Sequence, residues 1–219
     1  MTTIQEWIQL YLTEKKQILD QLPVSEIAKL TEWVIETYEK GSTIFAMGNG
    51  GNAGTVDHIY CDFKHHPFVS EDKQSGISGK VKRLHFINLC GSASELTGLV
   101  NDLGVEEMFA AALLPDVKPG DLVMGFSGSG NSKNVIKAFE CARAHDARTV
   151  AITKGDGGKC KSAADLCIVI PGTSKFPGQT GKNDNNFHFE DAVLYINSMV
   201  VGILKHHVYQ KLSTHYDLT

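Results

Sequence analysis

The stretch "MGNGGNAGTVDHIYCDF", residues 47–63, leads from an apolar run through a glycine-rich turn into a helix-patterned segment. The apolar run, "TIFAMG" at 43–48, has the length and β-branched content of a buried strand. Glycines permit positive φ and close approach of backbone N–H groups, and a helix start carries partial positive charge. The turn "GNGGN", 48–52, is therefore either a plain tight turn or an anion site.

The same unit of strand followed by helix recurs along the chain. Short apolar runs that we expect to be strands lie at 43–48, 84–91, 121–128, 148–155 and 166–172. Helix-patterned segments lie at 52–65, 94–114, 131–145, 157–164 and 187–210. Two amphipathic helices, 2–20 and 24–40, precede them, and Ser25 is the expected cap of the second. This alternation predicts an α/β fold, a parallel sheet with helices on both faces.

Length and composition set the class of protein. The 219 residues suit a single domain, 1–219, with a helical pair at 1–40 and an α/β core at 41–210. A net charge of -4 without long Lys or Arg runs argues against nucleic acid or an anionic membrane as partner. The N-terminus resembles neither a signal peptide nor a membrane span, so we expect a cytoplasmic protein.

The cysteines do not form a recognisable site. All five are scattered and none is paired as CxxC, so the sequence suggests neither a disulfide framework nor a cysteine zinc site. We expect buried free thiols.

A second turn, "SGSGNS" at 127–132, also follows an apolar strand and precedes a helix. The hydroxyls of Ser127, Ser129 and Ser132, with exposed backbone amides, can donate several hydrogen bonds to one phosphate without a lysine. Ligands of parallel sheets bind beyond the carboxyl ends of the strands. We therefore interpret this turn as an anion site rather than a plain loop.

Other turns are less specific. In "CGSASELTG", 90–98, Ser92 either caps a helix or contacts a substrate hydroxyl. In "GDGG", 155–158, Asp156 is expected to cap a short helix. The polar segments 66–83 and 173–186 are long loops, and by hypothesis the first of them borders the site.

His58 and Asp62 stand four residues apart in the helix that follows the first turn. Side chains at this spacing share one helix face. They can bind a divalent metal together, act as acid and base on one substrate, or form an ordinary surface pair.

The two turns together resemble the sugar isomerase (SIS) domain family, in particular its phosphoheptose isomerase branch. The resemblance rests on "GNGGN" with His58 ten residues after Gly48, on "SGSGNSKNV", and on the segments at 95–110, 118–132 and 151–159. It implies a five-stranded parallel sheet flanked by helices, and a homotetramer whose sites lie between subunits. It also implies a phosphorylated sugar as ligand.

The resemblance further implies which residues form the site. The loop that holds the phosphate would comprise Ser127, Gly128, Ser129, Asn131 and Ser132, with Asn49, Gly50, Gly51, Asn52 and Ser92 nearby. Asp62 is the implied catalytic base and His58 a proton shuttle, and both are the implied ligands of a zinc ion. Glu190 and His188 of the last helix are reserve catalytic groups.

Five positions depart from the family pattern. The glutamine and second histidine of the last helix align with Phe189 and Asn197 or, if the alignment is shifted by one residue, with His188 and Ile196. The threonine between the loop serines aligns with Gly128, and the aspartate of a third turn aligns with Ser92. The first catalytic pair is also altered, because Asp62 stands where the family has glutamate. These departures favour a substrate other than sedoheptulose 7-phosphate.

Two functions of different class remain. The leading expectation is an aldose–ketose isomerase acting on a phosphosugar through an enediol. The alternative is a non-catalytic SIS protein that senses phosphosugars or binds a protein partner, such as a replication initiator. A nucleotide-binding Rossmann enzyme is excluded because the first turn lacks the required glycine spacing.

Overall fold

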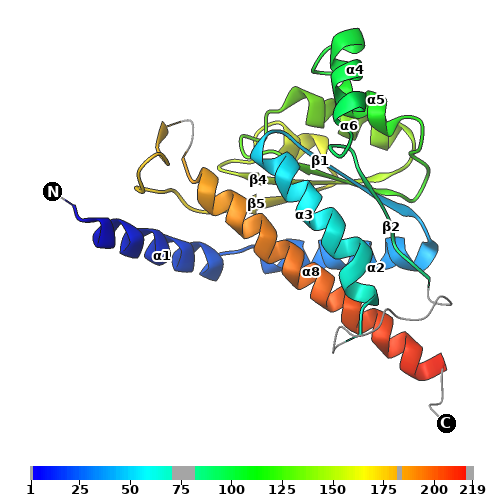
Figure 1. Cartoon of the computed structure of the whole chain (residues 1–219), viewed down its shortest axis with the longest axis horizontal. Helices are drawn as coiled ribbons and strands as arrows, with labels where there is room; N and C mark the ends of the chain where they lie inside the picture. Colours follow the sequence, from blue (N-terminus) through cyan, green and yellow to red (C-terminus); the bar gives the residue numbers. More distant parts are fainter. Residues whose placement is uncertain (1, 71–81, 182–183, 216–219) are drawn as a thin grey trace.

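A five-stranded sheet lies at the centre of the chain (Figure 1). The computed structural model describes residues 2–70, 82–181 and 184–215. All strand pairs are parallel and the strand order is β2-β1-β3-β4-β5. The strands are β1 Thr43–Gly48, β2 His85–Asn88, β3 Leu122–Phe126, β4 Arg148–Lys154 and β5 Leu166–Ile170. The predicted α/β fold with a parallel sheet is confirmed.

Helices cover both faces of the sheet. They are α1 Ile4–Asp20, α2 Val24–Lys40, α3 Gly51–His65, α4 Ala93–Leu103, α5 Met108–Leu113, α6 Lys133–Ala144, α7 Cys160–Ala163 and α8 Asn186–His215, with a 3-10 turn, η1, at His66–Phe68. In Figure 1, α1 extends away from the sheet and α8 runs diagonally across one face. The two helices expected before the sheet are present.

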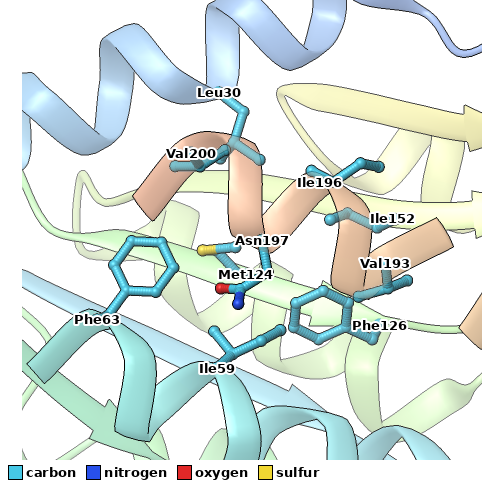
Figure 2. A pocket seen from close by; sticks show the side chains of 10 residues that line it. All are labelled: Leu30, Ile59, Phe63, Met124, Phe126, Ile152, Val193, Ile196, Asn197 and Val200. Atoms are coloured by element: carbon cyan, nitrogen blue, oxygen red, sulfur yellow. The ribbon is translucent and has the colours of Figure 1, made fainter. Parts of the chain in front are cut away.

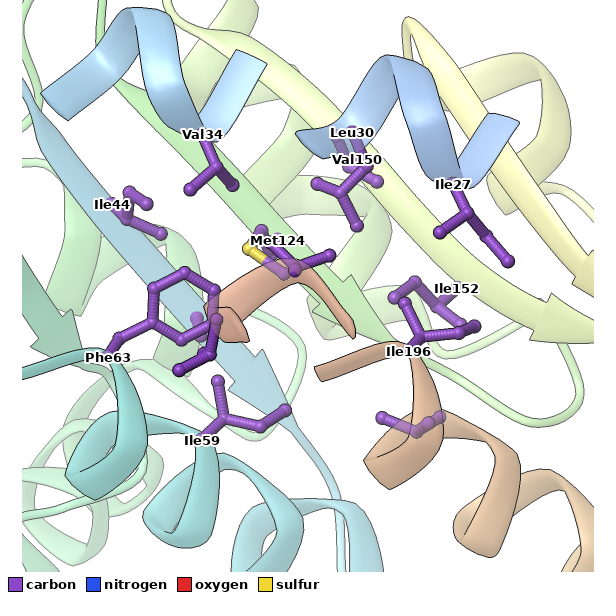
Figure 3. Close-up of a cluster of buried hydrophobic side chains, with 14 of the residues drawn as sticks. Ile27, Leu30, Val34, Ile44, Ile59, Phe63, Met124, Val150, Ile152 and Ile196 are labelled. Carbon is purple, nitrogen blue, oxygen red and sulfur yellow. The ribbon is translucent and has the colours of Figure 1, made fainter. Parts of the chain in front are cut away.

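Alternation along β1 divides the core into two clusters, because successive strand side chains point to opposite faces. Ile44 packs with α2, α3 and α8 in the cluster of Figure 3. Phe45 and Met47 pack on the other face against α5 and α6. The sheet is thus buried on both sides, which explains the continuous apolar runs in the sequence.

Three local expectations were wrong. Segment 94–114 forms two helices because Gly104, at φ 88°, ends the first of them. Ser25 lies inside the first turn of α2, where its hydroxyl donates a hydrogen bond to the Glu26 carboxylate, while Pro23 occupies the N-cap position. Asp156 accepts from the amide of Gly158 at 2.9 Å, ahead of α7, rather than capping that helix.

The long helix α8 is a core element. Residues 186–211 are apolar and long enough to cross a bilayer, but half of an apolar 18-residue window within them is buried inside the protein. The helix packs against α2, α3 and η1. Its hydrophobicity is therefore explained by the core.

The cysteines are free thiols, as expected, but not all are buried. Cys160 is buried and Cys61 is exposed, whereas the remaining three are partly covered. Cys61 corrects the expectation of burial because it lies on the outer face of α3.

Gly125 in the central strand β3 allows α6 to approach the sheet. A Cβ atom at this position would lie 2.6 Å from the ring of Phe139 and 2.7 Å from a methyl group of Val135. Both neighbours are fully buried and belong to the same helix. The spacing between sheet and helix therefore depends on glycine here.

We expect Gly125→Ala to lower the free energy of unfolding by about 1–3 kcal/mol, because the added methyl group overpacks the core. Gly98→Ala is the matched control, since no atom lies within 4 Å of a Cβ there. Within a helix this control should be neutral or stabilising by up to about 1 kcal/mol. Urea unfolding of both variants measures the difference, and equal stabilities would contradict the packing argument.

Candidate active site

The pairing of β1 with β3 brings the two glycine turns together. Gly48 at the end of β1 lies opposite Phe126 at the end of β3. Beyond them, the side-chain amides of Asn49 and Asn134 exchange two hydrogen bonds, of 3.0 and 2.9 Å. Asn134 is buried in the first turn of α6. This amide pair fixes the start of α3 relative to the start of α6.

The first turn leaves room for a ligand and for a carboxylate. Gly50 has φ 57° and ψ -122°, a conformation that a side chain would strain. A Cβ on Gly51 would lie 2.7 Å from Oε1 of Glu190, so this carboxylate lies against the start of α3. The Oδ1 atom of Asn52 is buried and has no hydrogen-bond partner in the described part of the chain.

The serine loop is held in shape by its own hydrogen bonds. The hydroxyls of Ser127 and Ser132 lie 2.8 Å apart, and Ser127 is buried. The Asn131 amide donates to the Ser129 hydroxyl at 3.2 Å. Its side-chain oxygen accepts from the amide of Lys159 at 3.2 Å, which fastens the loop to the turn before α7. Hydroxyls and the N-terminus of α6 therefore meet in one place, an arrangement suited to phosphate.

Three polar side chains connect α3 with α8 further along the two helices. His58 Nε2 lies 3.2 Å from Asp62 Oδ2, and the same carboxylate oxygen accepts from Nδ2 of Asn197 at 2.7 Å. The His58 side chain is 58% exposed and that of Asp62 is 31% exposed. The arrangement gives a half-buried carboxylate with a fixed orientation beside a solvent-exposed imidazole, which is suited to proton transfer.

Asn197 is the functional candidate that the sequence revealed least. Figure 2 shows it reaching from α8 into an apolar pocket, beside Ile59 and Met124. The cavity there measures about 10 Å³, and Oδ1 of Asn197 has no partner in the described part of the chain. The available signal was an asparagine inside the apolar face that Ile196 and Val200 define.

Glu190 lies at the other end of this face of α8. It accepts a hydrogen bond of 3.1 Å from Asn186 in the first turn of the helix. Glu190 and Asn197 are seven residues apart, which corresponds to about 10 Å along a helix. One carboxylate thus lies near the glycine turns and the other, Asp62, lies deeper along the seam between α3 and α8.

The structure does not bring His188 to this seam. Positions 188 and 197 are nine residues apart, which turns them about half a revolution from each other on the helix. His188 is fully buried toward α1, where its ring stacks on Tyr11 at 4.2 Å between centroids. Its Nε2 atom lies 3.1 Å from Glu14 Oε2. His188 therefore connects helices rather than facing His58 and Asp62.

Glu14 is the centre of this second polar cluster. The Ser174 hydroxyl donates to it at 2.7 Å and the Lys175 amide at 2.8 Å. Burial pushes the pKa of Glu14 up, but the hydrogen bonds from Lys175 and Ser174 outweigh it, so the pKa lies below its usual value. The ionised carboxylate therefore stabilises the contact between α1 and α8.

The end of β2 joins the same edge of the sheet. The Cys90 thiol lies 3.3 Å from the carbonyl oxygen of Gly48, and burial raises its pKa. Two residues later, the Ser92 hydroxyl accepts from the Glu95 amide at 3.2 Å. Of the two alternatives for Ser92, the geometry shows the capping role.

His58 and Asp62 are two possible zinc ligands that lie side by side on α3. Within the described ranges, no group of three or more His, Cys, Asp and Glu side chains converges on one point. His58 and Asp62 supply two ligands, whereas catalytic zinc is held by three protein side chains. Residues 71–81 of the 66–83 loop lie outside the described residues, so its expected position at the site stays a hypothesis.

Comparisons with known proteins bear on the family and the fold of this chain. A model of the SIS domain family matches residues 94–180. Phosphoheptose isomerase from Chlorobaculum parvum is 34% identical over 164 residues, which cover 75% of each chain. Two solved phosphoheptose isomerases share the fold. The Neisseria gonorrhoeae structure has a TM-score of 0.77 at 21% identity, covering 93% of this chain and 100% of that one. The Francisella tularensis structure has a TM-score of 0.76 at 20% identity, covering 93% and 99%.

We expect Glu14→Gln to lower the free energy of unfolding by about 1–3 kcal/mol at pH 7. Because the folded-state pKa of Glu14 is depressed, the stabilisation exists above the unfolded pKa of about 4.3 and is lost as pH falls through the folded value. The gap between wild type and variant should therefore narrow below about pH 4. Urea unfolding between pH 3 and 7 measures it.

The control for this series is Glu32→Gln, which removes an exposed partner of Lys29 and should change stability by less than about 1 kcal/mol. A gap for Glu14→Gln that stays constant with pH would contradict the role given to the ionised carboxylate.

Proposed function

Because the chain belongs to the phosphoheptose isomerase branch of the SIS domain family, we propose that it is a sugar-phosphate isomerase that interconverts an aldose and a ketose. One geometric observation carries the proposal. The serine loop and the start of α3 open at the same sheet edge, fixed by the Asn49–Asn134 pair, while Asp62 lies further along α3. A phosphate can therefore be held at one end of the site and proton transfer can occur at the other.

The phosphate would bind at the serine loop. Ser127, Ser129 and Ser132 offer hydroxyl donors, and the amides at the start of α6 point to the same space. Binding energy from this remote group holds the sugar chain in one orientation, which lowers the entropic barrier of the proton transfers. Asn49, Gly50 and Gly51 border the same space from the first turn.

The proton transfers need one base and one group near the oxygens. We assign Asp62 as the base that removes the proton from the carbon beside the carbonyl and returns it to the neighbouring carbon of the enediol. Asn197 holds the orientation of this carboxylate through its 2.7 Å hydrogen bond. His58 would move the proton between the two sugar oxygens, because its ring nitrogen is 3.2 Å from Asp62 and its side chain is exposed.

A buried amide oxygen in the first glycine turn supports a polyhydroxylated ligand. Oδ1 of Asn52 is a buried acceptor without a partner in the described chain. Sugar hydroxyls are donors that can satisfy such atoms. Phe189 and Asn197 stand where the family pattern has glutamine and histidine, and this difference is the basis for proposing a sugar other than sedoheptulose 7-phosphate.

A second candidate is a phosphosugar sensor without catalysis. The observation in its favour is Asn197, whose amide neither accepts nor releases a proton at the position where it meets Asp62. Such a protein would keep the phosphate loop and lose proton exchange. Deuterium incorporation into the sugar, the measurement proposed below, distinguishes the sensor from the isomerase.

We propose self-association into a homotetramer with sites between subunits. Helix α1 exposes Ile4, Ile8 and Leu12, and a cavity of about 340 Å³ beside them is bordered by Phe176 and Phe187. This apolar surface is suited to burial against another copy of the chain.

Two wider proposals follow from packing and from the thiols. Residues 1–219 are proposed as a single SIS domain, because Ile27 and Leu30 of the N-terminal pair lie in the same core as the sheet. Free thiols are typical of a reducing compartment, which supports a cytoplasmic location.

We expect Asp62→Asn to lower proton exchange by about 100-fold to 10,000-fold, the usual contribution of a general base. The measurement is deuterium incorporation by NMR when the protein is incubated in D2O with a panel of aldose and ketose phosphates, with and without zinc. Asp102→Asn, on the exposed side of α4, is the matched control and should react like wild type.

Each outcome of this assay decides between assignments. Exchange that persists in Asp62→Asn and disappears in Glu190→Gln would transfer the role of base to Glu190. Phosphosugar binding without exchange in wild type would contradict the isomerase and favour the sensor.

We expect Ile8→Glu combined with Leu12→Glu to reduce the mass measured by light scattering, because charges would be placed in the proposed interface. Val24→Glu, at a side chain that is 75% exposed on α2, is the control. An unchanged mass in the double variant would exclude α1 from the interface.

A further inference from the structure

Lys154 ends strand β4 beside the serine loop. Strand β4 pairs with β3, so its carboxyl end reaches the same edge of the sheet. The backbone amide of Lys154 donates to the carbonyl of Gly128 at 3.3 Å. Its side chain then returns over the loop, because a Cβ atom placed on Gly128 would lie 3.3 Å from Cε of Lys154. The absence of a side chain at Gly128 leaves room for this lysine.

The ammonium group of Lys154 has a neutral partner. Its Nζ atom donates to the backbone carbonyl of Asp184. No carboxylate of the described residues forms an ion pair with it. A lysine ammonium has three N–H donors, so donors remain for another acceptor. The side chain is half-buried, and a covered cation is stabilised most by an anion.

The nearby carboxylate of Glu190 is engaged elsewhere. Asn186 lies over the loop with its Oδ1 atom 3.2 Å from the Cβ position of Gly128, while its Nδ2 atom donates to Glu190 at 3.1 Å. Glu190 is also directed at Gly51. The amide of Asn186 therefore lies between the serine loop and Glu190. The Glu190 carboxylate thus does not neutralise the Lys154 ammonium, whose positive charge is available at the loop.

We propose that Lys154 is a phosphate-binding residue of the serine loop, whose ammonium contacts the phosphomonoester of the substrate. This inference rests on the proposed phosphosugar ligand and adds to it the source of its charge recognition. The serines and amides supply neutral donors only. A lysine supplies a charge-assisted hydrogen bond, which is about twice as strong as a neutral one.

The test is binding of inorganic phosphate, measured by isothermal titration calorimetry. Lys154→Met keeps the length of the side chain and removes its charge. We expect its dissociation constant for phosphate to rise by about 10- to 100-fold, the effect of losing one hydrogen bond to a charged group. Lys154→Arg keeps the charge and should remain closer to wild type than Lys154→Met.

Lys118→Met is the matched control, because it removes the same charge at the opposite edge of the sheet, ahead of β3. Its phosphate affinity should equal that of wild type. Thermal unfolding of each variant without phosphate tests whether Lys154 instead holds the segment around Asp184. If Lys154→Met lowers the midpoint temperature of unfolding but leaves the phosphate affinity unchanged, the lysine has a structural role and the proposal is overturned.

Failure of the inference and failure of the proposed function give different results. Equal phosphate affinity of wild type and Lys154→Met, or no phosphate binding by wild type, overturns the role of Lys154. A loss of affinity in Lys154→Met without sugar isomerisation by wild type supports the lysine and contradicts the isomerase.

Discussion

The parallel pairing of β1 with β3 is the constraint on which the site depends. It places two strand ends at one level, so that the turns after them, each leading into a helix, share one space. The two hydrogen bonds between the Asn49 and Asn134 amides then fix the start of α3 relative to the start of α6. Every later feature of the site, from the serine hydroxyls to the carboxylates, is positioned relative to this pair.

Helix α8 links the two chemical functions of the site. Asn186 and Glu190 in its early turns lie at the glycine turns, while Asn197 holds Asp62 about 10 Å further along. The opposite face of the same helix carries His188, which contacts α1. A phosphate end, a proton-transfer end and the contact with the N-terminal helix are therefore arranged on one rigid element.

The sequence predicted what local patterns encode. Apolar runs and glycine turns identified the strands, the parallel sheet and the two candidate loops, because strand burial and turn geometry depend on neighbouring residues. Residues that act through distant partners were not predictable. Lys154 is 26 residues from Gly128, and Asn197 meets Asp62 from the other end of the chain. His188 was expected at the site because a one-residue shift of the alignment offered it as a catalytic group. Such a shift turns a residue by about 100° around the helix, and His188 in fact faces α1.

The place of α8 in chain order has a consequence for synthesis. Residues 49–52 leave the ribosome more than 130 residues before Glu190 and Asn197. Contacts of such large sequence separation close late and slowly. A nascent chain that already carries the whole sheet still lacks the helix that orients Asp62 and covers the glycine turns. The proposed proton transfer is thus restricted to chains that already include α8.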